Sequence, residues 1–188
     1  IGEWIQRYAQ IPIKEYEKYA KKFNPVNYDP VEWVKIMKRT GMKYVVITSK
    51  HHDGFALWDS KVSDYDAVDF APIGKDLLKG LSEACKKEGI KFGLYHSIMD
   101  WHHPQAQAND EPRYDYQNVS NPDFPIYYNN YLKPQLKELI DNYDPVQIAK
   151  IYDENKVTCL SVLTEQDFFL GNLVHISKIK QHFNLSLI

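Results

Sequence analysis

Cysteine is scarce in this sequence, which contains only Cys85 and Cys159 among 188 residues. Two cysteines so far apart provide neither a disulfide framework nor a zinc site, and we expect buried thiols. No apolar stretch approaches the roughly eighteen residues of a membrane span. No charged-then-apolar signal segment opens the chain, although its first residue is Ile1 rather than Met. The net charge of −2, with acidic and basic residues interspersed, offers no basic surface for nucleic acid or lipid phosphates. The composition therefore favours a neutral ligand.

Aromatic residues are abundant, at 14% of the chain with Tyr 14 and Trp 4. The hydrophobic share of 44% and the charged share of 26% are those of an ordinary globular protein. Two interpretations of the aromatic excess remain open. It can form a large aromatic core, or it can supply ring faces that stack on the C–H face of a pyranose.

A helix, a glycine and a strand follow one another twice along the chain. The strand segments, 43–49 (KYVVITS) and 90–97 (IKFGLYHS), are apolar at successive positions, which predicts a parallel sheet covered on both faces. Long loops follow both strands. This alternation indicates an α/β fold, with either a barrel or an open sheet. The predicted helices cover residues 13–23, 30–40, 77–88 and about 132–143, with Asp29 and Asp76 as N-caps.

Two adjacent histidines, His51 and His52, follow the first predicted strand and precede an Asp-Gly turn. Neighbouring strand residues face opposite sides, so both imidazoles can reach one pocket only if the backbone turns there. Such a pair can hydrogen-bond vicinal sugar hydroxyls or bind a metal. Surface histidines in a turn are the alternative.

The second predicted strand leads into the string GLYHSIMDWHHP, at residues 93–104. It adds His96, His102 and His103 to the histidine pair, which raises the alternative of a metal-dependent hydrolase. The spacing matches no familiar metal site, and His102 and His103 are equally consistent with an exposed turn.

Three long strings occur in the order TSKHHDGFALWDSKVSDYDAV, KFGLYHSIMDWHHP and LKPQLKELIDNYDP, after a Gly-Glu-Trp segment near the start. Together they resemble the retaining α-L-fucosidases of glycoside hydrolase family 29, especially the bacterial type, over residues 1–145. The resemblance implies a TIM-like (β/α) barrel that cleaves terminal α-L-fucose from glycans with retention of configuration, without a metal or organic cofactor. A periplasmic, secreted or lysosomal location is also implied.

The same resemblance implies how residues of this chain contact the sugar. Tyr95 would lie beside the reacting carbon and Trp101 at the pocket rim, while the histidine pair and Glu3 would hydrogen-bond fucose hydroxyls. The implied substrate-binding residues are Glu3, Trp4, His51, His52, Tyr95 and Trp101.

The catalytic carboxylates are harder to place by resemblance. Retaining glycosidases use a carboxylate nucleophile and a carboxylic acid/base about 5 Å apart. The family's nucleophile lies in a W-F-D-G-type strand end, where this chain reads VQIAKIYDENK, so Asp153 is the candidate nucleophile. No family motif assigns the acid/base to Glu154 or Glu165.

The chain has fewer predicted strands than a closed eight-stranded barrel needs. The strand that precedes residue 1 in the family is missing, and residues 146–188 form a divergent tail. Three explanations remain: a fragment, a truncated or frame-shifted sequence with a foreign tail, and a shortened paralogue. Truncation is the favoured one. We expect exposed strand edges to promote self-association, and a catalytically inactive fucose-binding remnant is the alternative function.

Overall fold

A computed structural model describes residues 2–106, 123–140, 159–160 and 186–187. The chain divides into two compact units, Ile1–Gln135 and Leu136–Ile188. In the second unit, two short parallel strands pair with each other. The elements in chain order are η1 (Gly2–Trp4), α1 (Ile5–Tyr8), α2 (Ile13–Ala20), α3 (Pro30–Arg39), β1 (Tyr44–Lys50), α4 (Leu77–Glu88), β2 (Lys91–His96), η2 (Pro104–Ala106), α5 (Phe124–Tyr127), the π-helical η3 (Tyr128–Leu132), α6 (Lys133–Ile140), β3 (Cys159–Leu160) and β4 (Ser186–Leu187).

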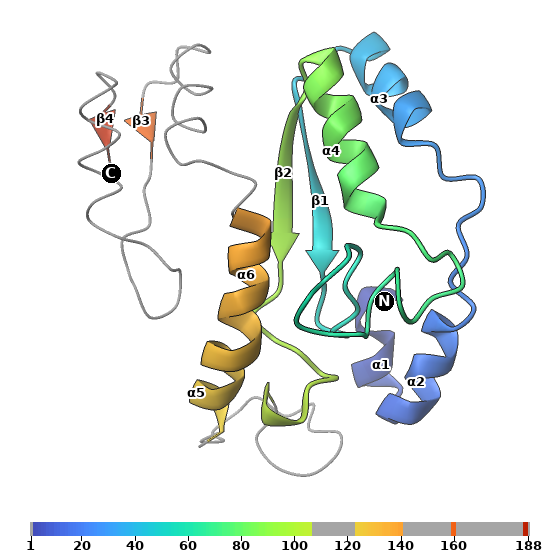
Figure 1. Ribbon diagram of the computed structural model, residues 1–188, viewed down its shortest axis with the longest axis vertical. Coiled ribbons are helices and arrows are strands. Elements are labelled where there is room, and N and C mark those ends of the chain that lie inside the picture. The colour runs from blue at the N-terminus through green and yellow to red at the C-terminus, as the bar shows by residue number, and fades with distance from the viewer. Residues whose placement is uncertain (1, 107–122, 141–158, 161–185, 188) are drawn as a thin grey trace. The chain divides into compact units, whose positions relative to one another are not determined.

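The first unit is built on a βαβ arrangement in which β1 and β2 pair in parallel and α4 connects them (Figure 1). The register places Tyr44 opposite Lys91 and Thr48 opposite Tyr95, and it shifts between Thr48 and Lys50. Because the strands are parallel and in close register, their carboxyl ends lie side by side. This confirms the predicted parallel α/β pairing.

The helix boundaries follow from local capping chemistry. The Asp29 carboxylate accepts hydrogen bonds from the backbone of Val31 and Glu32 at the start of α3. Asp76 does the same at the start of α4, where its side chain accepts from two backbone N–H groups. Gly89 ends α4 with φ 71°, a left-handed conformation that glycine adopts without strain. The predicted caps are confirmed.

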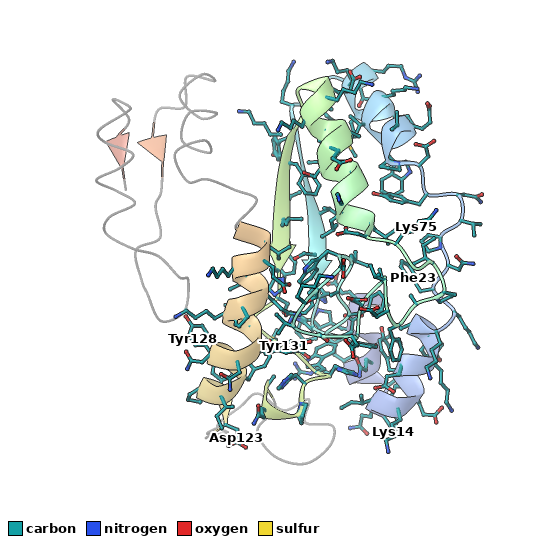
Figure 2. All side chains as sticks on the ribbon, viewed as in Figure 1. Lys14, Phe23, Lys75, Asp123, Tyr128 and Tyr131 are labelled. Atoms are coloured by element: carbon teal, nitrogen blue, oxygen red, sulfur yellow. The ribbon has the colours of Figure 1, made fainter. Side chains whose placement is uncertain are left out.

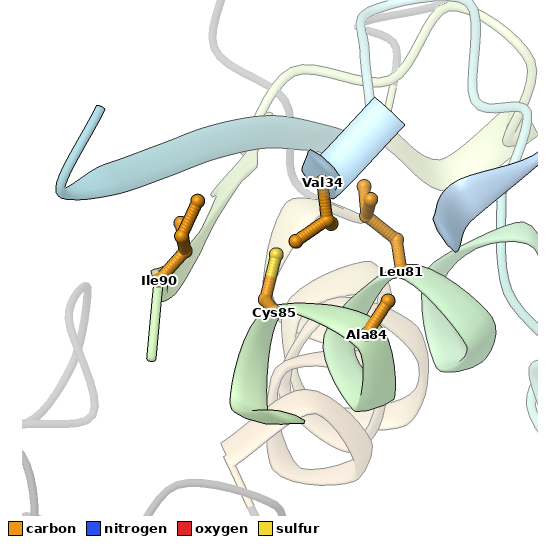
Figure 3. Close-up of a cluster of buried hydrophobic side chains, with 5 residues drawn as sticks. All are labelled: Val34, Leu81, Ala84, Cys85 and Ile90. Atoms are coloured by element: carbon orange, nitrogen blue, oxygen red, sulfur yellow. The ribbon is translucent and has the colours of Figure 1, made fainter. Parts of the chain in front are cut away.

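The core of this unit lies between the helices α3 and α4 and one face of the β1–β2 pair. Figure 3 shows its buried cluster, to which α3 contributes Val34 and α4 contributes Leu81, Ala84 and Cys85. Cys85 is a buried free thiol, as predicted, whereas the side chain of Cys159 lies outside the described residues. Ile90, just before β2, completes the cluster.

The other face of the strand pair is not covered in the same way. Tyr44 is 66% exposed and Val46 is 58% exposed, while Val45 and Ile47 pack against the core. The prediction of strands buried on both faces was therefore wrong for the described part of the chain. The reason is that α3 and α4 both lie on one side of the strand pair, so alternate side chains remain in solvent.

No helix among the described residues is long and apolar enough to cross a membrane.

Candidate sugar-binding site

Five of the six predicted sugar-binding residues come from three separate segments of the first unit. Glu3 and Trp4 lie on η1, the histidine pair immediately follows β1, and Tyr95 lies near the end of β2. The N-terminal helices lie beyond the arrowheads of both strands (Figure 1). Side chains gather densely in the same region (Figure 2). The site therefore occupies the carboxyl edge of the parallel pair, where α/β proteins usually place ligands.

The turn after β1 brings the two imidazoles together. The rings of His51 and His52 have centroids 4.0 Å apart. Gly54 closes the turn by donating its backbone N–H to the carbonyl of His51 at 3.1 Å, with φ 81°. A Cβ at Gly54 would lie 2.6 Å from a carboxylate oxygen of Asp100 and 2.7 Å from Cβ of His102. Only glycine fits this close approach, which confirms the predicted turn.

Aromatic rings surround the imidazole of His52. Trp4 meets His52 edge to face, with centroids 5.2 Å apart, and meets Trp101 in the same way at 5.6 Å. Trp101 lies 5.1 Å from His52, and its backbone N–H donates to the His52 carbonyl at 2.6 Å. On the other side, His51 lies 5.6 Å from Tyr95, which is 42% exposed.

Trp101 has a different place from the expected one. It is 1% exposed and hence lies beneath the site, not at a pocket rim. The physical reason is that the indole of Trp4 and the imidazole of His52 both pack against it. Trp101 can support these rings, and Trp4 is the more accessible of the two indoles.

The electrostatic environment keeps His52 neutral. Burial lowers the pKa of His52 to about 4, and the neighbouring His51 adds to this effect, while the negative charge of Glu3 opposes it. Nδ1 of His52 lies 2.6 Å from the hydroxyl oxygen of Ser97. At neutral pH, the ring is therefore an uncharged hydrogen-bonding group.

A second histidine with a lowered pKa, the half-buried His96, lies at the end of β2. Burial lowers the pKa of His96 to about 3, and the positive charge of Lys50 contributes to the shift. Its Nδ1 lies 2.9 Å from the hydroxyl oxygen of Ser49, while its Nε2 is buried without a partner among the described residues. Sequence reasoning noted His96 but gave no role to Ser49 or Ser97.

A buried ion pair lies beneath these histidines. Nζ of Lys50 donates to Oδ2 of Asp100 at 2.7 Å and to the hydroxyl of Tyr127 at 3.1 Å, and the Lys50 and Asp100 side chains are both 0% exposed. The other oxygen of Asp100 accepts from the backbone N–H groups of His102 and His103. Burial alone would raise the pKa of Asp100, but the charge of Lys50 and these hydrogen bonds lower it. Sequence analysis gave Lys50 no role, although a lysine within a strand end is the signal that could have identified it.

His102 and His103 do not form an exposed turn, and among the described residues neither belongs to a group with metal-ligand spacing. His102 stacks on Tyr65 with centroids 3.9 Å apart, and its Nε2 lies 2.9 Å from a carboxylate oxygen of Glu17. The ring of His103 packs against Tyr131 at 4.4 Å. Both side chains therefore contribute to packing.

Among the residues that the structure describes, the group with metal-binding spacing is acidic and contains no histidine. It consists of Asp59, Asp66 and Asp69, whose ligand atoms lie within 4.8 Å of one another. The carboxylate of Asp66 already accepts hydrogen bonds from the backbone N–H groups of Ser60, Val68 and Asp69. These contacts fold the loop, so the cluster has a structural explanation.

The candidate nucleophile Asp153 lies outside the described residues, as do Glu154 and Glu165, to which no catalytic role is assigned.

The parallel strand pair, with histidines and indoles at its carboxyl edge, makes this an α/β protein with a candidate ligand site at the usual place. The chain belongs to the α-L-fucosidase family, whose model matches residues 2–159. A second model, that of indole-3-glycerol phosphate synthase, matches residues 132–188, which is less than half of the chain.

Individual relatives agree with this assignment. An α-L-fucosidase of Dictyostelium discoideum is 35% identical over 131 residues, covering 69% of this chain and 27% of that protein. The crystal structure of the α-L-fucosidase from Vibrio sp. strain EJY3 has a TM-score of 0.67 at 34% identity, covering 76% of this chain and 24% of the other. A trapped covalent intermediate of a Bacteroides thetaiotaomicron α-L-fucosidase, formed with 2-fluoro-fucosyl fluoride, has a TM-score of 0.62 at 37% identity. The match covers 75% of this chain and 31% of the other.

The chain spans about a quarter to just over a third of the length of its curated relatives, at 27% of the Dictyostelium protein and 37% of a bovine tissue α-L-fucosidase.

Proposed function

We propose that this chain is part of a retaining α-L-fucosidase that removes terminal α-L-fucose from glycans through a covalent glycosyl-enzyme. The observation that carries the proposal is the convergence of His51, His52, Trp4 and Tyr95 at one strand edge. These groups suit a deoxy sugar, because fucose presents vicinal hydroxyls together with apolar C–H surface. The trapped intermediate of the Bacteroides relative supports the covalent route.

Each residue of the site has a distinct proposed role. His51, His52 and Glu3 hydrogen-bond the sugar hydroxyls, and Tyr95 lines the pocket beside the reacting carbon. Trp4 contacts the sugar, and the buried Trp101 holds Trp4 and His52 in place. Burial lowers the pKa of His52 to about 4, so this imidazole is neutral at pH 7.

The bond-breaking step needs two carboxyl groups. Asp153 is our candidate nucleophile: its carboxylate would attack the anomeric carbon as a general acid protonates the departing oxygen. In the second step the same residue, now deprotonated, would act as a general base and take a proton from the water that hydrolyses the glycosyl-enzyme. No residue of this chain is assigned to that acid/base role.

The fold and domain assignments also remain proposals beyond the described strand pair. We propose that residues 1–145 form the N-terminal part of a (β/α) barrel and that 146–188 form a divergent tail. The solvent-exposed face of β1, with Tyr44 and Val46, is the surface through which we expect the isolated chain to self-associate.

Binding of L-fucose to the isolated chain tests the site directly. Two exposed tyrosines on the strand pair provide a matched comparison, since Tyr95 is 42% exposed at the carboxyl end and Tyr44 is 66% exposed at the amino end of β1. We expect Tyr95→Ala to weaken L-fucose binding by about tenfold, which corresponds to roughly 1.4 kcal/mol. Tyr44→Ala should leave binding unchanged. Equal effects of the two variants, measured by titration calorimetry, would contradict the proposed site.

Hydrolysis of 4-nitrophenyl α-L-fucopyranoside tests the catalytic part separately. We expect the 188-residue chain to turn this substrate over slowly, because no residue is assigned to the base that activates water for hydrolysis of the glycosyl-enzyme, and such assistance typically contributes about 10²–10⁴-fold. Ordinary glycosidase turnover that Asp153→Ala abolishes would contradict this expectation. It would also show that Asp153 is essential for turnover, as the proposed nucleophile must be.

A further inference from the structure

The hydroxyl group of Ser97 lies within hydrogen-bond distance of two partners, a backbone carbonyl and an imidazole nitrogen. Its oxygen is 2.7 Å from the carbonyl oxygen of Met99 and 2.6 Å from Nδ1 of His52. A carbonyl oxygen carries no proton, so it can only accept a hydrogen bond. The single hydroxyl proton of Ser97 must therefore be donated to Met99.

Donation of the Ser97 proton to Met99 determines which atom is the donor and which the acceptor in the contact between Ser97 and His52. Since the hydroxyl proton is committed to Met99, the Ser97 oxygen can offer only a lone pair to the imidazole. Nδ1 of His52 must then carry the proton and donate it to Ser97. A neutral imidazole has one N–H group, so Nε2 retains its lone pair.

Nε2 of His52 is the atom left for a ligand. It makes no hydrogen bond with any residue that the structure describes, and it is not among the enclosed atoms, whereas the Nε2 of His96 is buried. Trp4 and Trp101 pack against the same ring.

Ser49 of β1 and His96 of β2 form a second serine–histidine pair with the same arrangement. The hydroxyl of Ser49 donates to the carbonyl of Tyr95 at 2.8 Å, and its oxygen lies 2.9 Å from Nδ1 of His96. The same reasoning places a proton on Nδ1 of His96. Its Nε2 is enclosed in the protein, so this second serine–histidine pair provides an internal control.

We propose that Ser97 is a positioning residue that locks His52 in the Nδ1–H tautomer, so that Nε2 accepts a hydrogen bond from a hydroxyl group of the sugar. The nature of the ligand rests on the proposed function, whereas the tautomer follows from the protein alone. The lowered pKa of His52 supports this assignment, because a protonated ring would present a donor at both nitrogens.

An Nε2 atom that only accepts hydrogen bonds affects which ligands the site prefers. Glu3 acts electrostatically on His52, and an ionised carboxylate, like the Nε2 lone pair, only accepts hydrogen bonds. In the proposed function the Glu3 carboxylate contacts the same sugar, so the ligand would meet two hydrogen-bond acceptors, which favour hydroxyl donors and repel carboxylate or phosphate groups. The site would thereby select a neutral, hydroxylated ring over an anionic sugar.

The tautomer can be measured by NMR on the full chain labelled with ¹⁵N at histidine. Long-range ¹H–¹⁵N spectra distinguish a protonated from an unprotonated ring nitrogen, and His52→Gln identifies the signals of His52 by their disappearance. We expect a protonated Nδ1 and an unprotonated Nε2 in the wild-type protein at pH 7. A protonated Nε2 of His52, or rapid averaging of the two forms, would overturn the proposal.

The role of Ser97 is tested by comparing two serine substitutions. Ser97→Ala should release His52 into a tautomer mixture and leave His96 unchanged, whereas Ser49→Ala should affect His96 alone. If the required tautomer falls to about a fifth of the population, the apparent Kd for L-fucose rises about fivefold. A His52 tautomer that Ser97→Ala does not alter would show that Ser97 does not control it.

Addition of L-fucose separates this proposal from the proposed function. We expect the Nε2 signal of His52 to move toward the position of a hydrogen-bonded nitrogen, while the signals of His96 stay in place. If L-fucose does not bind at all, the proposed function fails, but the spectrum of the ligand-free protein still decides the tautomer. If L-fucose binds and the Nε2 signal of His52 stays unchanged, the acceptor role is wrong.

Discussion

Replacement of Lys50 by methionine should be among the most damaging single changes in the first unit. The substitution removes the cation that neutralises Asp100, and both side chains are 0% exposed. Removing one partner of a buried pair costs about 3–5 kcal/mol, because the remaining charge stays buried without compensation. That loss is a large fraction of the roughly 5–15 kcal/mol by which a domain is stable. Methionine approximates the length of the lysine stem, so cavity formation contributes little.

The pH dependence of this loss identifies its cause. In the wild type, Lys50 lowers the pKa of Asp100, so the ionised carboxylate stabilises the fold above its ordinary pKa and this contribution is lost as the pH falls through the lowered value. In Lys50→Met, burial acts without the cation and raises the pKa of Asp100 above that of the unfolded chain. The variant should then regain stability relative to the wild type as the pH falls through the raised value.

Urea unfolding followed by tryptophan fluorescence measures both effects. The matched control is Lys18→Met, because Lys18 pairs with Glu15 on the surface of α2, with side chains 62% and 56% exposed. Such an exposed pair contributes little to stability, and the control should unfold almost as the wild type does. A deficit below about 1 kcal/mol for Lys50→Met at pH 7, or a deficit that does not shrink in acid, would refute the reasoning.

Two further predictions concern the turn and the buried imidazoles. Gly54→Ala should lower the free energy of unfolding by well over the roughly 1 kcal/mol of left-handed backbone strain, because its Cβ would lie 2.6 Å from a carboxylate oxygen of Asp100. Gly41→Ala, at φ 82° with open space around it, should show the backbone strain alone. Thermal unfolding distinguishes the two variants, and equal losses of stability would rule out the clash. The folded-state pKa values of His52, about 4, and His96, about 3, lie below the ordinary 6.5, so unfolding takes up protons below that pH. The contribution of the two neutral histidines to the free energy of unfolding is fully present above pH 6.5. We expect their combined contribution to fall by on the order of 2–3 kcal/mol per pH unit between pH 6 and 5. A urea midpoint that does not change over this range would contradict the assigned pKa values.

The sequence predicted those features that depend on neighbouring residues. The N-caps Asp29 and Asp76 and the turn at Gly54 follow from local chemistry, because each acts on backbone groups within a few positions. The resemblance predicted which residues approach the sugar, and the structure brings the histidine pair, Trp4 and Tyr95 together.

The features that sequence reasoning missed depend on residues far apart in the chain. Lys50 and Asp100 are separated by 50 positions, and His52 and Ser97 by 45. No local pattern connects such pairs, because their contact exists only once β1 and β2 have paired in register. The burial of Trp101 is of the same kind, since Trp4 and His52 cover it from distant segments.

These contacts across the strand pair explain how one βαβ unit can hold the part of the site that lies at its strand ends. Lys50 joins Asp100, Ser49 joins His96, and Ser97 joins the turn that carries His52, so three links connect the carboxyl ends of the same two strands. Each link uses a buried polar group, which is costly to leave unpaired and therefore resists separation of the two loops. The proposed sugar-recognition residues lie between residues 3 and 101, whereas the candidate nucleophile lies much later in the chain. Recognition and bond cleavage should consequently be separable, so that substitutions at Asp153 alter turnover and leave the tautomer of His52 unchanged.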